Sequence, residues 1–235
     1  MAVTEPYYQD DWVTIYHGDC LEVDEWLSAD VLVTDPPYGV NLTEKLYKEG
    51  SAGLGTYGVY QDTPENHAKI VVPAIQRWAD TGKRGAVTPG TKRMLEMPTP
   101  AHVGAFACPA GTGRASWGFN LWQPIMYYGK DPYLADGKGS RPDSYFYKKA
   151  IPSSYEHPVA KPMIWMEWLV RRVSREGETI ADPFMGSGTT LVAAKAQGRK
   201  SIGVEIEERY CEVAAKRCAQ DYLFGEALRE LEAQE

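Results

Sequence analysis

Two short stretches of the chain combine hydrogen-bond acceptors, prolines and glycines in ways that could support chemistry. The first is Asp35-Pro36-Pro37-Tyr38, which follows an apolar run over residues 30–34. Prolines fix the backbone and lack an N–H, so Asp35 and the Pro36 carbonyl form a rigid acceptor pair for an amino group. Two such bonds push the nitrogen lone pair towards sp³ geometry and make it nucleophilic, and Tyr38 offers a flat face to an aromatic ring. Taken alone, a proline-stiffened turn is the simpler explanation.

The second stretch is a glycine-containing turn at residues 182–188, between a predicted strand and a predicted helix. Glycines let the backbone approach a ligand, and the start of the helix presents free N–H groups. Glu205 ends the next predicted strand, where an acid can accept hydrogen bonds from both hydroxyls of a ribose. The turn has neither the Lys-Ser/Thr of a Walker loop nor a three-glycine dinucleotide pattern, which favours an adenosine-type ligand without a pyrophosphate. A helix-packing turn beside a solvated Glu205 is the alternative.

Alternating strands and helices must position both stretches. The predicted strands cover residues 12–16, 30–34, 84–88, 179–181 and 200–206, and the predicted helices cover 20–28, 64–79, 162–174, 189–197 and 208–220. This alternation predicts a single α/β domain with a mostly parallel sheet and helices on both faces. Residues 39–61 hold five glycines and several tyrosines, and predict a long mobile loop.

The middle of the chain, about residues 91–157, is irregular and predicts a β-hairpin and loops. It lies within residues 83–175, which hold 14 Lys/Arg against 6 Asp/Glu, although the whole chain has a net charge of −7. A basic middle interleaved with tyrosines suits stacking on bases and contacts to a phosphate backbone. An unevenly charged surface and an irregular core are the alternatives.

Composition narrows the class of protein. Apolar residues make up 43% and charged residues 24%, which excludes a disordered chain. No apolar run approaches the roughly 18 residues that cross a bilayer, and the acidic first residues predict no secretory signal and no membrane partner. The four cysteines form no CxxC pair or zinc spacing, which predicts a reducing, cytoplasmic compartment and no metal site.

The two stretches together resemble the exocyclic-amino DNA methyltransferases that use S-adenosylmethionine. Asp35-Pro-Pro-Tyr38 precedes Asp182-Pro-Phe-Met-Gly-Ser-Gly-Thr-Thr190, the order of the beta permutation of that family. Gly18-Asp19, His157-Pro-Val-Ala-Lys161-Pro162 and Gly203-Val-Glu205-Ile match as well, so the resemblance covers roughly residues 12–40 and 155–220.

The resemblance implies a Rossmann-like fold with a seven-stranded sheet, although the sequence pattern itself predicts about five strands. It implies that Asp35, Pro36, Pro37 and Tyr38 hold the target amine and stack its base. Asp19 would lie near the adenine of the cofactor, Lys161 near its methionine end, and Glu205 at its ribose. The cofactor-binding set it implies is Asp19, Lys161, Asp182, Phe184, Gly186, Ser187, Gly188, Thr189 and Glu205. Residues 91–157 would be an inserted small target-recognition region.

The implied activity is direct methyl transfer to a base flipped out of double-stranded DNA, with the loop after Tyr38 closing over it. Asp at the first tetrad position is typical of adenine-N6 members and Ser of cytosine-N4 members, so adenine is favoured, although both bases carry an exocyclic NH₂. A cytosine-N4 enzyme and a non-catalytic methyltransferase-like DNA-binding subunit are alternatives. RNA or protein amide methylation is a further one, but those relatives place the cofactor turn first and begin the tetrad with Asn. The sequence leaves a homodimer open.

Overall fold

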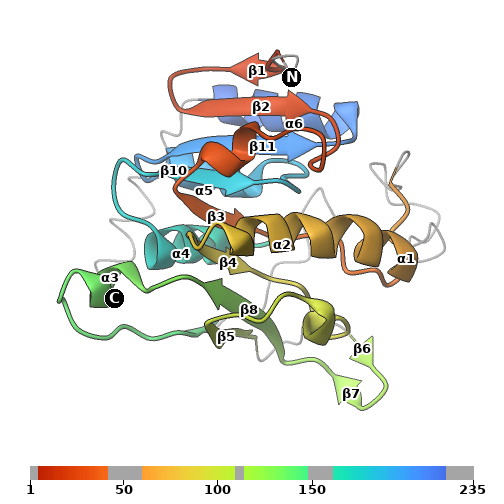
Figure 1. The fold of residues 1–235 in the computed structure, drawn as a ribbon, viewed down its shortest axis with the longest axis vertical. Coiled ribbons are helices and arrows are strands. Elements are labelled where there is room, and N and C mark those ends of the chain that lie inside the picture. Colours follow the sequence, from red (N-terminus) through yellow and green to blue (C-terminus); the bar gives the residue numbers. More distant parts are fainter. Residues whose placement is uncertain (1–4, 42–59, 109–113, 148–160, 221–235) are drawn as a thin grey trace.

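A central β-sheet with helices on both faces organises the molecule (Figure 1). The computed structural model describes residues 5–41, 60–108, 114–147 and 161–220. The sheet strands are β1 (Tyr8–Gln9), β2 (Val13–His17), β3 (Val31–Thr34), β4 (Arg84–Val87), β5 (His102–Ala107), β8 (Trp122–Tyr128), β9 (Tyr145–Phe146), β10 (Thr179–Asp182) and β11 (Lys200–Glu205), and β6 (Arg114–Ala115) and β7 (Gly118–Phe119) form a separate hairpin. The helices are α1 (Pro64–Asn66), α2 (Val72–Asp80), α3 (Pro132–Ala135), α4 (Met163–Val173), α5 (Thr189–Lys195) and α6 (Glu208–Ala219), with short turns η1 (Glu25–Ser28), η3 (His67–Val71) and η4 (Met94–Glu96).

The strand order is β1-β2-β11-β10-β3-β4-β8-β5-β9. The five strands from β2 to β4 pair in parallel, whereas β1 and β8 join this block antiparallel at its two sides. The mostly parallel, Rossmann-like α/β sheet expected from the sequence is therefore confirmed. Parallel neighbours all end at the same edge, so the loops after β2, β3, β10 and β11 meet there.

The middle of the sheet is buried on both faces, which explains its nearly continuous apolar strands. Val31, Leu32 and Val33 of β3 are all fully buried. Leu32 packs in one core with α2, and its two neighbours pack in a second core with α4 and α5. Because side chains alternate between the two faces of a strand, one apolar run packs against two helical layers.

The first layer holds a pair of tryptophans far apart in the chain. Trp26 of η1 and Trp78 of α2 stack with ring centroids 5.9 Å apart, and both are fully buried. Helices α4, α5 and α6 cover the opposite face, where α5 contacts both of the others (Figure 1).

The irregular middle of the chain contributes three strands to the sheet. β5, β8 and β9 all come from residues 91–157 and extend the sheet to nine strands among the described residues, not seven. The sequence predicted a β-hairpin in this region but not the bounds of these strands, because Gly104 within β5 and Pro124 within β8 weaken the strand pattern. Among the described strands, β6 and β7 form a hairpin apart from the sheet, just before β8 (Figure 1).

The helix predicted over residues 20–28 is wrong in its first part. Only Glu25–Ser28 forms a helical turn. The indole of Trp26 donates to the Cys20 carbonyl, and the guanidinium of Arg77 donates to the Cys20 and Leu21 carbonyls. Side chains thereby take the acceptors that a helix would have used for its own backbone.

The helix predicted over residues 64–79 forms, but it contains the π-helical turn η3 between α1 and α2. Most of the loop predicted over residues 39–61 lies outside the described residues. No helix in the part of the chain that the structure describes is long and apolar enough to span a membrane.

The buried tryptophan pair makes a direct prediction about stability. Trp78→Ala removes a fully buried ring, so we expect it to lower the free energy of unfolding by roughly 3–5 kcal/mol. Trp117, in the turn between β6 and β7, is fully exposed, so the same substitution there should change stability by less than about 0.5 kcal/mol. Urea denaturation of the two variants measures the difference, and equal losses would contradict the packing described here.

Candidate active site

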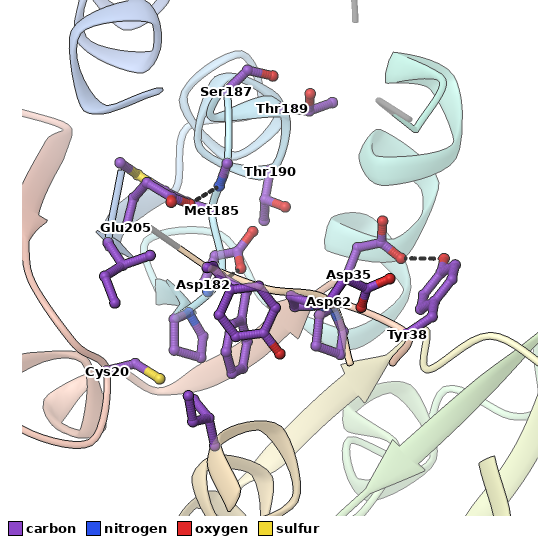
Figure 2. A pocket seen from close by; sticks show the side chains of 18 of the residues that line it. Cys20, Asp35, Tyr38, Asp62, Asp182, Met185, Ser187, Thr189, Thr190 and Glu205 are labelled. Atoms are coloured by element: carbon purple, nitrogen blue, oxygen red, sulfur yellow. Dashed lines mark hydrogen bonds between the residues drawn. The ribbon is translucent and has the colours of Figure 1, made fainter. Parts of the chain in front are cut away.

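Four strand ends line one pocket at the carboxyl edge of the sheet (Figure 2). Gly18 and Asp19 follow β2, the Asp35–Tyr38 tetrad follows β3, the glycine turn follows β10, and Glu205 ends β11. Among the predicted cofactor residues, Asp19, Lys161, Asp182, Phe184, Gly186, Ser187, Thr189 and Glu205 line this pocket, as do Asp35, Pro36, Pro37 and Tyr38. Gly188 is not among the lining residues. Because β3 and β10 pair in parallel, both sequence motifs lie at the same cavity.

A buried hydrogen bond fastens the two motifs together. The hydroxyl of Thr34, at the end of β3, donates to Asp182 Oδ1 over 2.6 Å, joining residues 148 positions apart. The same carboxylate oxygen accepts from the backbone N–H of Phe184 over 3.1 Å. Asp182 is only 2% exposed, and this burial raises the pKa of its carboxyl to about 7. Its side chain thus connects the two strand ends from inside the protein.

The two glycines of the turn have different reasons to be glycine. Gly188 has φ +79°, and a Cβ there would lie 2.8 Å from the Cβ of Ala214 in α6. Gly186 has φ +51°, but nothing lies within 4 Å of where its Cβ would be. Gly188 therefore lets two helices pack, whereas Gly186 turns the backbone and leaves open space beside the pocket.

The polar side chains of the turn are held by α6. Arg217 donates to the Ser187 carbonyl over 2.6 Å, to the Ser187 hydroxyl over 3.0 Å and to the Thr189 hydroxyl over 3.3 Å. The start of α5 is thus attached to the neighbouring helix. Figure 2 shows Ser187 and Thr189 away from the group formed by Asp35, Asp62 and Tyr38.

Glu205 closes the far side of the turn. Its Oε2 accepts from the backbone N–H of Gly186 over 3.0 Å and its Oε1 from that of Glu207 over 2.9 Å. Burial raises the pKa of this carboxyl to about 7. Each oxygen keeps a further lone pair, so the carboxylate can accept two more hydrogen bonds from a ligand in the pocket.

The tetrad is held in place by hydrogen bonds to its first residue. Asp35 Oδ1 accepts from the Tyr38 hydroxyl over 2.7 Å and from the Thr88 hydroxyl over 2.6 Å. The Tyr38 ring lies against Gly90, where a Cβ would come within 3.0 Å of Tyr38 Cγ. The Asp35 carboxylate and the tyrosine ring are therefore fixed before any ligand arrives.

Lys161 joins this cluster. Its ammonium lies 3.2 Å from Asp35 Oδ1, donates to Gln123 Oε1 over 2.9 Å, and contacts the Tyr38 hydroxyl. It also stands 4.8 Å over the Tyr38 ring, and its side chain is 9% exposed. The resemblance implied a place near the methionine end of the cofactor, whereas in the structure this ammonium contacts the tetrad.

Three residues of the site had no motif in the sequence. Thr88 follows β4, the parallel neighbour of β3, and could have been found from that position. Gln123 lies on β8, a strand that the sequence pattern did not resolve. Asp62 accepts from the backbone N–H groups of Gly39 over 2.6 Å and Val40 over 3.2 Å, and so fixes the chain after the tetrad.

Comparisons with known proteins show which proteins this chain resembles. Residues 113–216 match the N6/N4 family model described as DNA methylase. The type II methyltransferase M.ScaI of Streptomyces caespitosus is 29% identical over 92% of this chain and 84% of that protein. These two matches support an exocyclic-amino DNA methyltransferase. Over shorter stretches, the type II methyltransferase M2.DpnII of Streptococcus pneumoniae is 43% identical across 30% of this chain and 26% of its own length.

Solved structures of other proteins share the fold. The M1.HpyAVI complex with S-adenosylmethionine has a TM-score of 0.61 at 18% identity, covering 88% of this chain and 100% of that one. The PvuII cytosine-N4-specific DNA methyltransferase has a TM-score of 0.59 at 16% identity, covering 98% and 95%. These structures confirm the predicted fold, and the family model and the relatives support the predicted S-adenosylmethionine-dependent methyltransferase.

The charge of the pocket fits that cofactor. Its described lining holds five acids, Asp19, Asp35, Asp62, Asp182 and Glu205, against one cation, Lys161. An acidic cavity favours a cationic sulfonium ligand. The open space at Gly186 and the free lone pairs of Glu205 suit a nucleoside, so the residues present fit the group.

The raised pKa of Glu205 predicts a pH-dependent stability. Between its ordinary pKa of 4.5 and about 7, the folded protein keeps a proton that the unfolded chain releases, so stability falls as pH rises through this window. The side chain of the Glu205→Gln variant cannot ionise. Because the pocket admits solvent, we expect wild type to lose only about 1 kcal/mol more than this variant from pH 5 to pH 8. Urea denaturation without cofactor measures it, and parallel pH curves would contradict the raised pKa.

Proposed function

We propose that this chain transfers the methyl group of S-adenosylmethionine to the N6 amino group of adenine in double-stranded DNA. The observation that carries the proposal is the shared pocket, in which the tetrad and the glycine turn are joined by the Thr34–Asp182 bond. An amine acceptor and a nucleoside site in one cavity support transfer between two bound groups.

The cofactor end of the site comprises the glycine turn and Glu205. The carboxylate of Glu205 accepts the ribose hydroxyls, and the opening beside Gly186 admits the nucleoside. Asp19 lies near the adenine, with its Oδ1 already held by the Leu21 N–H over 2.8 Å. S-Adenosylmethionine supplies an activated sulfonium methyl, so no covalent enzyme intermediate is needed.

The amine end comprises the tetrad. Asp35 and the Pro36 carbonyl accept the two hydrogens of the target amine, and Tyr38 stacks on the base. Thr88 and Gly90 keep the carboxylate and the ring in position, so the amine is aligned without reorganisation during transfer. Transfer leaves the nitrogen with an extra proton, which Asp35 accepts.

The target base must leave the duplex to reach this site. Its amino group is paired inside DNA, whereas Asp35 lies in a pocket at the sheet edge. Flipping costs a few kcal/mol, which contacts with the tetrad offset. The Asp at the first tetrad position favours adenine; cytosine-N4 methylation by the same geometry is the second candidate.

The duplex would contact the segment around β8, which belongs to the target-recognition region proposed at residues 91–157. Gln123 at the start of β8 lies 3.2 Å from the Tyr38 hydroxyl, and the β6–β7 hairpin immediately precedes this strand. Trp117 in the hairpin turn is fully exposed and Phe119 is 69% exposed. An exposed ring so close along the chain to the amine site can fill the stack that a flipped base leaves.

Methyl transfer to unmethylated duplex DNA tests the function. With labelled S-adenosylmethionine and mass spectrometry of the digested nucleosides, we expect N6-methyladenine from wild type. Asp35→Ala should lower the rate at least about 10²-fold, because the amine loses a fixed acceptor. Asp24→Ala, in which the lost carboxylate pairs with Arg77 near the surface, is the matched control and should retain activity.

The product identifies the base. N4-methylcytosine would keep the mechanism and correct the base, whereas product formation by Asp35→Ala at the wild-type rate would contradict the role of the tetrad. A chain that binds cofactor but methylates neither base would favour the non-catalytic alternative.

The hairpin gives a separate prediction. Trp117→Ala should lower methylation of a fully paired target roughly tenfold, because nothing then fills the vacated stack. A mismatch at the target base should restore the rate, since that base is already unpaired. Trp12→Ala, at the β2 side of the sheet, controls for losing a partly exposed tryptophan. Equal losses on paired and mismatched DNA would assign Trp117 another role.

A further inference from the structure

Lys161 contacts two residues of the tetrad, Asp35 and Tyr38, that we propose to receive the target amine and its base. Its ammonium uses Asp35 Oδ1, at 3.2 Å, and stands over the Tyr38 ring on which the base would stack. Gln123 and the Tyr38 hydroxyl complete its surroundings, together with the Trp165 ring at 5.1 Å. A nitrogen cation of the protein therefore lies at Asp35, the carboxylate that we propose as an acceptor for the target amine.

This arrangement is incompatible with methyl transfer. As the methyl group moves, the target nitrogen gains positive charge, and an ammonium a few ångströms away opposes that charge in a site of low dielectric constant. The lysine also competes directly with the amine for Asp35. Lys161 must therefore leave the tetrad before the base binds productively.

The composition of the pocket indicates where the lysine goes. Lys161 is the one cation in the described lining of a pocket with five acids. The cofactor carries a carboxylate at its amino-acid end, which the acids of this pocket repel and which, among the described lining residues, this lysine alone attracts. The flexible four-carbon stem of a lysine allows its head to change partners.

We propose that Lys161 exchanges Asp35 for the carboxylate of S-adenosylmethionine, so that cofactor binding opens the amine site. The proposal rests on the proposed function, since it assumes that cofactor and amine share this pocket. The exchange couples the two sites: the Lys161–Asp35 pair opposes the cofactor's amino-acid end, and the bound cofactor frees Asp35 for the base. By linkage, target DNA in turn strengthens cofactor binding.

Two unreactive nucleosides separate the two halves of this exchange. S-Adenosylhomocysteine has the amino-acid end, whereas 5′-methylthioadenosine has the same adenosine and sulfur without it. We expect Lys161→Met to weaken the first about tenfold, because a charge-assisted hydrogen bond is lost, and to leave the second within about twofold. Isothermal titration calorimetry without DNA gives both constants, and 5′-methylthioadenosine binding reports that the variant is folded.

The opposite change tests the competition. Asp35→Asn keeps the shape of the side chain but gives up the charge that holds Lys161, so it should strengthen S-adenosylhomocysteine binding about threefold and leave 5′-methylthioadenosine unchanged. Lys195 and Asp10 form a matched pair outside the pocket, at 2.8 Å. Lys195→Met and Asp10→Asn should therefore change neither affinity.

Three outcomes of these titrations would contradict the exchange of Lys161 between Asp35 and the cofactor. If Lys161→Met weakens both nucleosides equally or neither, Lys161 does not meet the amino-acid end. If Asp35→Asn leaves S-adenosylhomocysteine binding unchanged, Asp35 does not compete for the lysine. If wild type binds neither nucleoside, the proposed function fails and the exchange fails with it. If wild type binds both nucleosides but one of the two variants gives the contrary result, the exchange alone is overturned.

Discussion

The parallel pairing of β3 with β10 is the constraint on which the site depends. Their register sets Ile180 opposite Val31 and Ala181 opposite Leu32, so both strands end at the same edge. The Thr34–Asp182 hydrogen bond then fastens the two ends. Without this pairing the tetrad and the glycine turn would be unrelated loops, because their separation in the sequence provides no local reason to meet.

Helices α6 and α4 hold different parts of the site at that edge. α6 holds the start of α5 through Arg217 and allows its close approach through Gly188, which stabilises the turn from behind. α4 begins directly after Lys161 and Pro162 and packs against β3 and β4, so the lysine enters the pocket from the opposite helical layer to α2. The cofactor end is thus rigid by packing, whereas the amine end contains a side chain with alternative partners.

The sequence predicted the parallel part of the sheet and the two motifs because both have strong local signals. The apolar run at Val31–Thr34 and the glycine turn after β10 need no distant information to be recognised. A hairpin was predicted in residues 91–157, but the bounds of β5 and β8 were not, because Gly104 and Pro124 weaken the strand pattern and the pairing of these strands depends on tertiary contacts. Because the sequence did not locate β8, Gln123 could not be assigned to the site.

The contacts of Lys161 likewise could not be predicted from the sequence. The sequence indicates a lysine near the pocket, but which acceptor it meets depends on the balance of charge that all strand ends contribute together. An acidic cavity attracts the sulfonium of the cofactor and repels its carboxylate, so one mobile cation allows the same cavity to receive both. The contact with Lys161 also gives the tetrad carboxylate a cationic partner, which an anion on the cofactor would draw away from it.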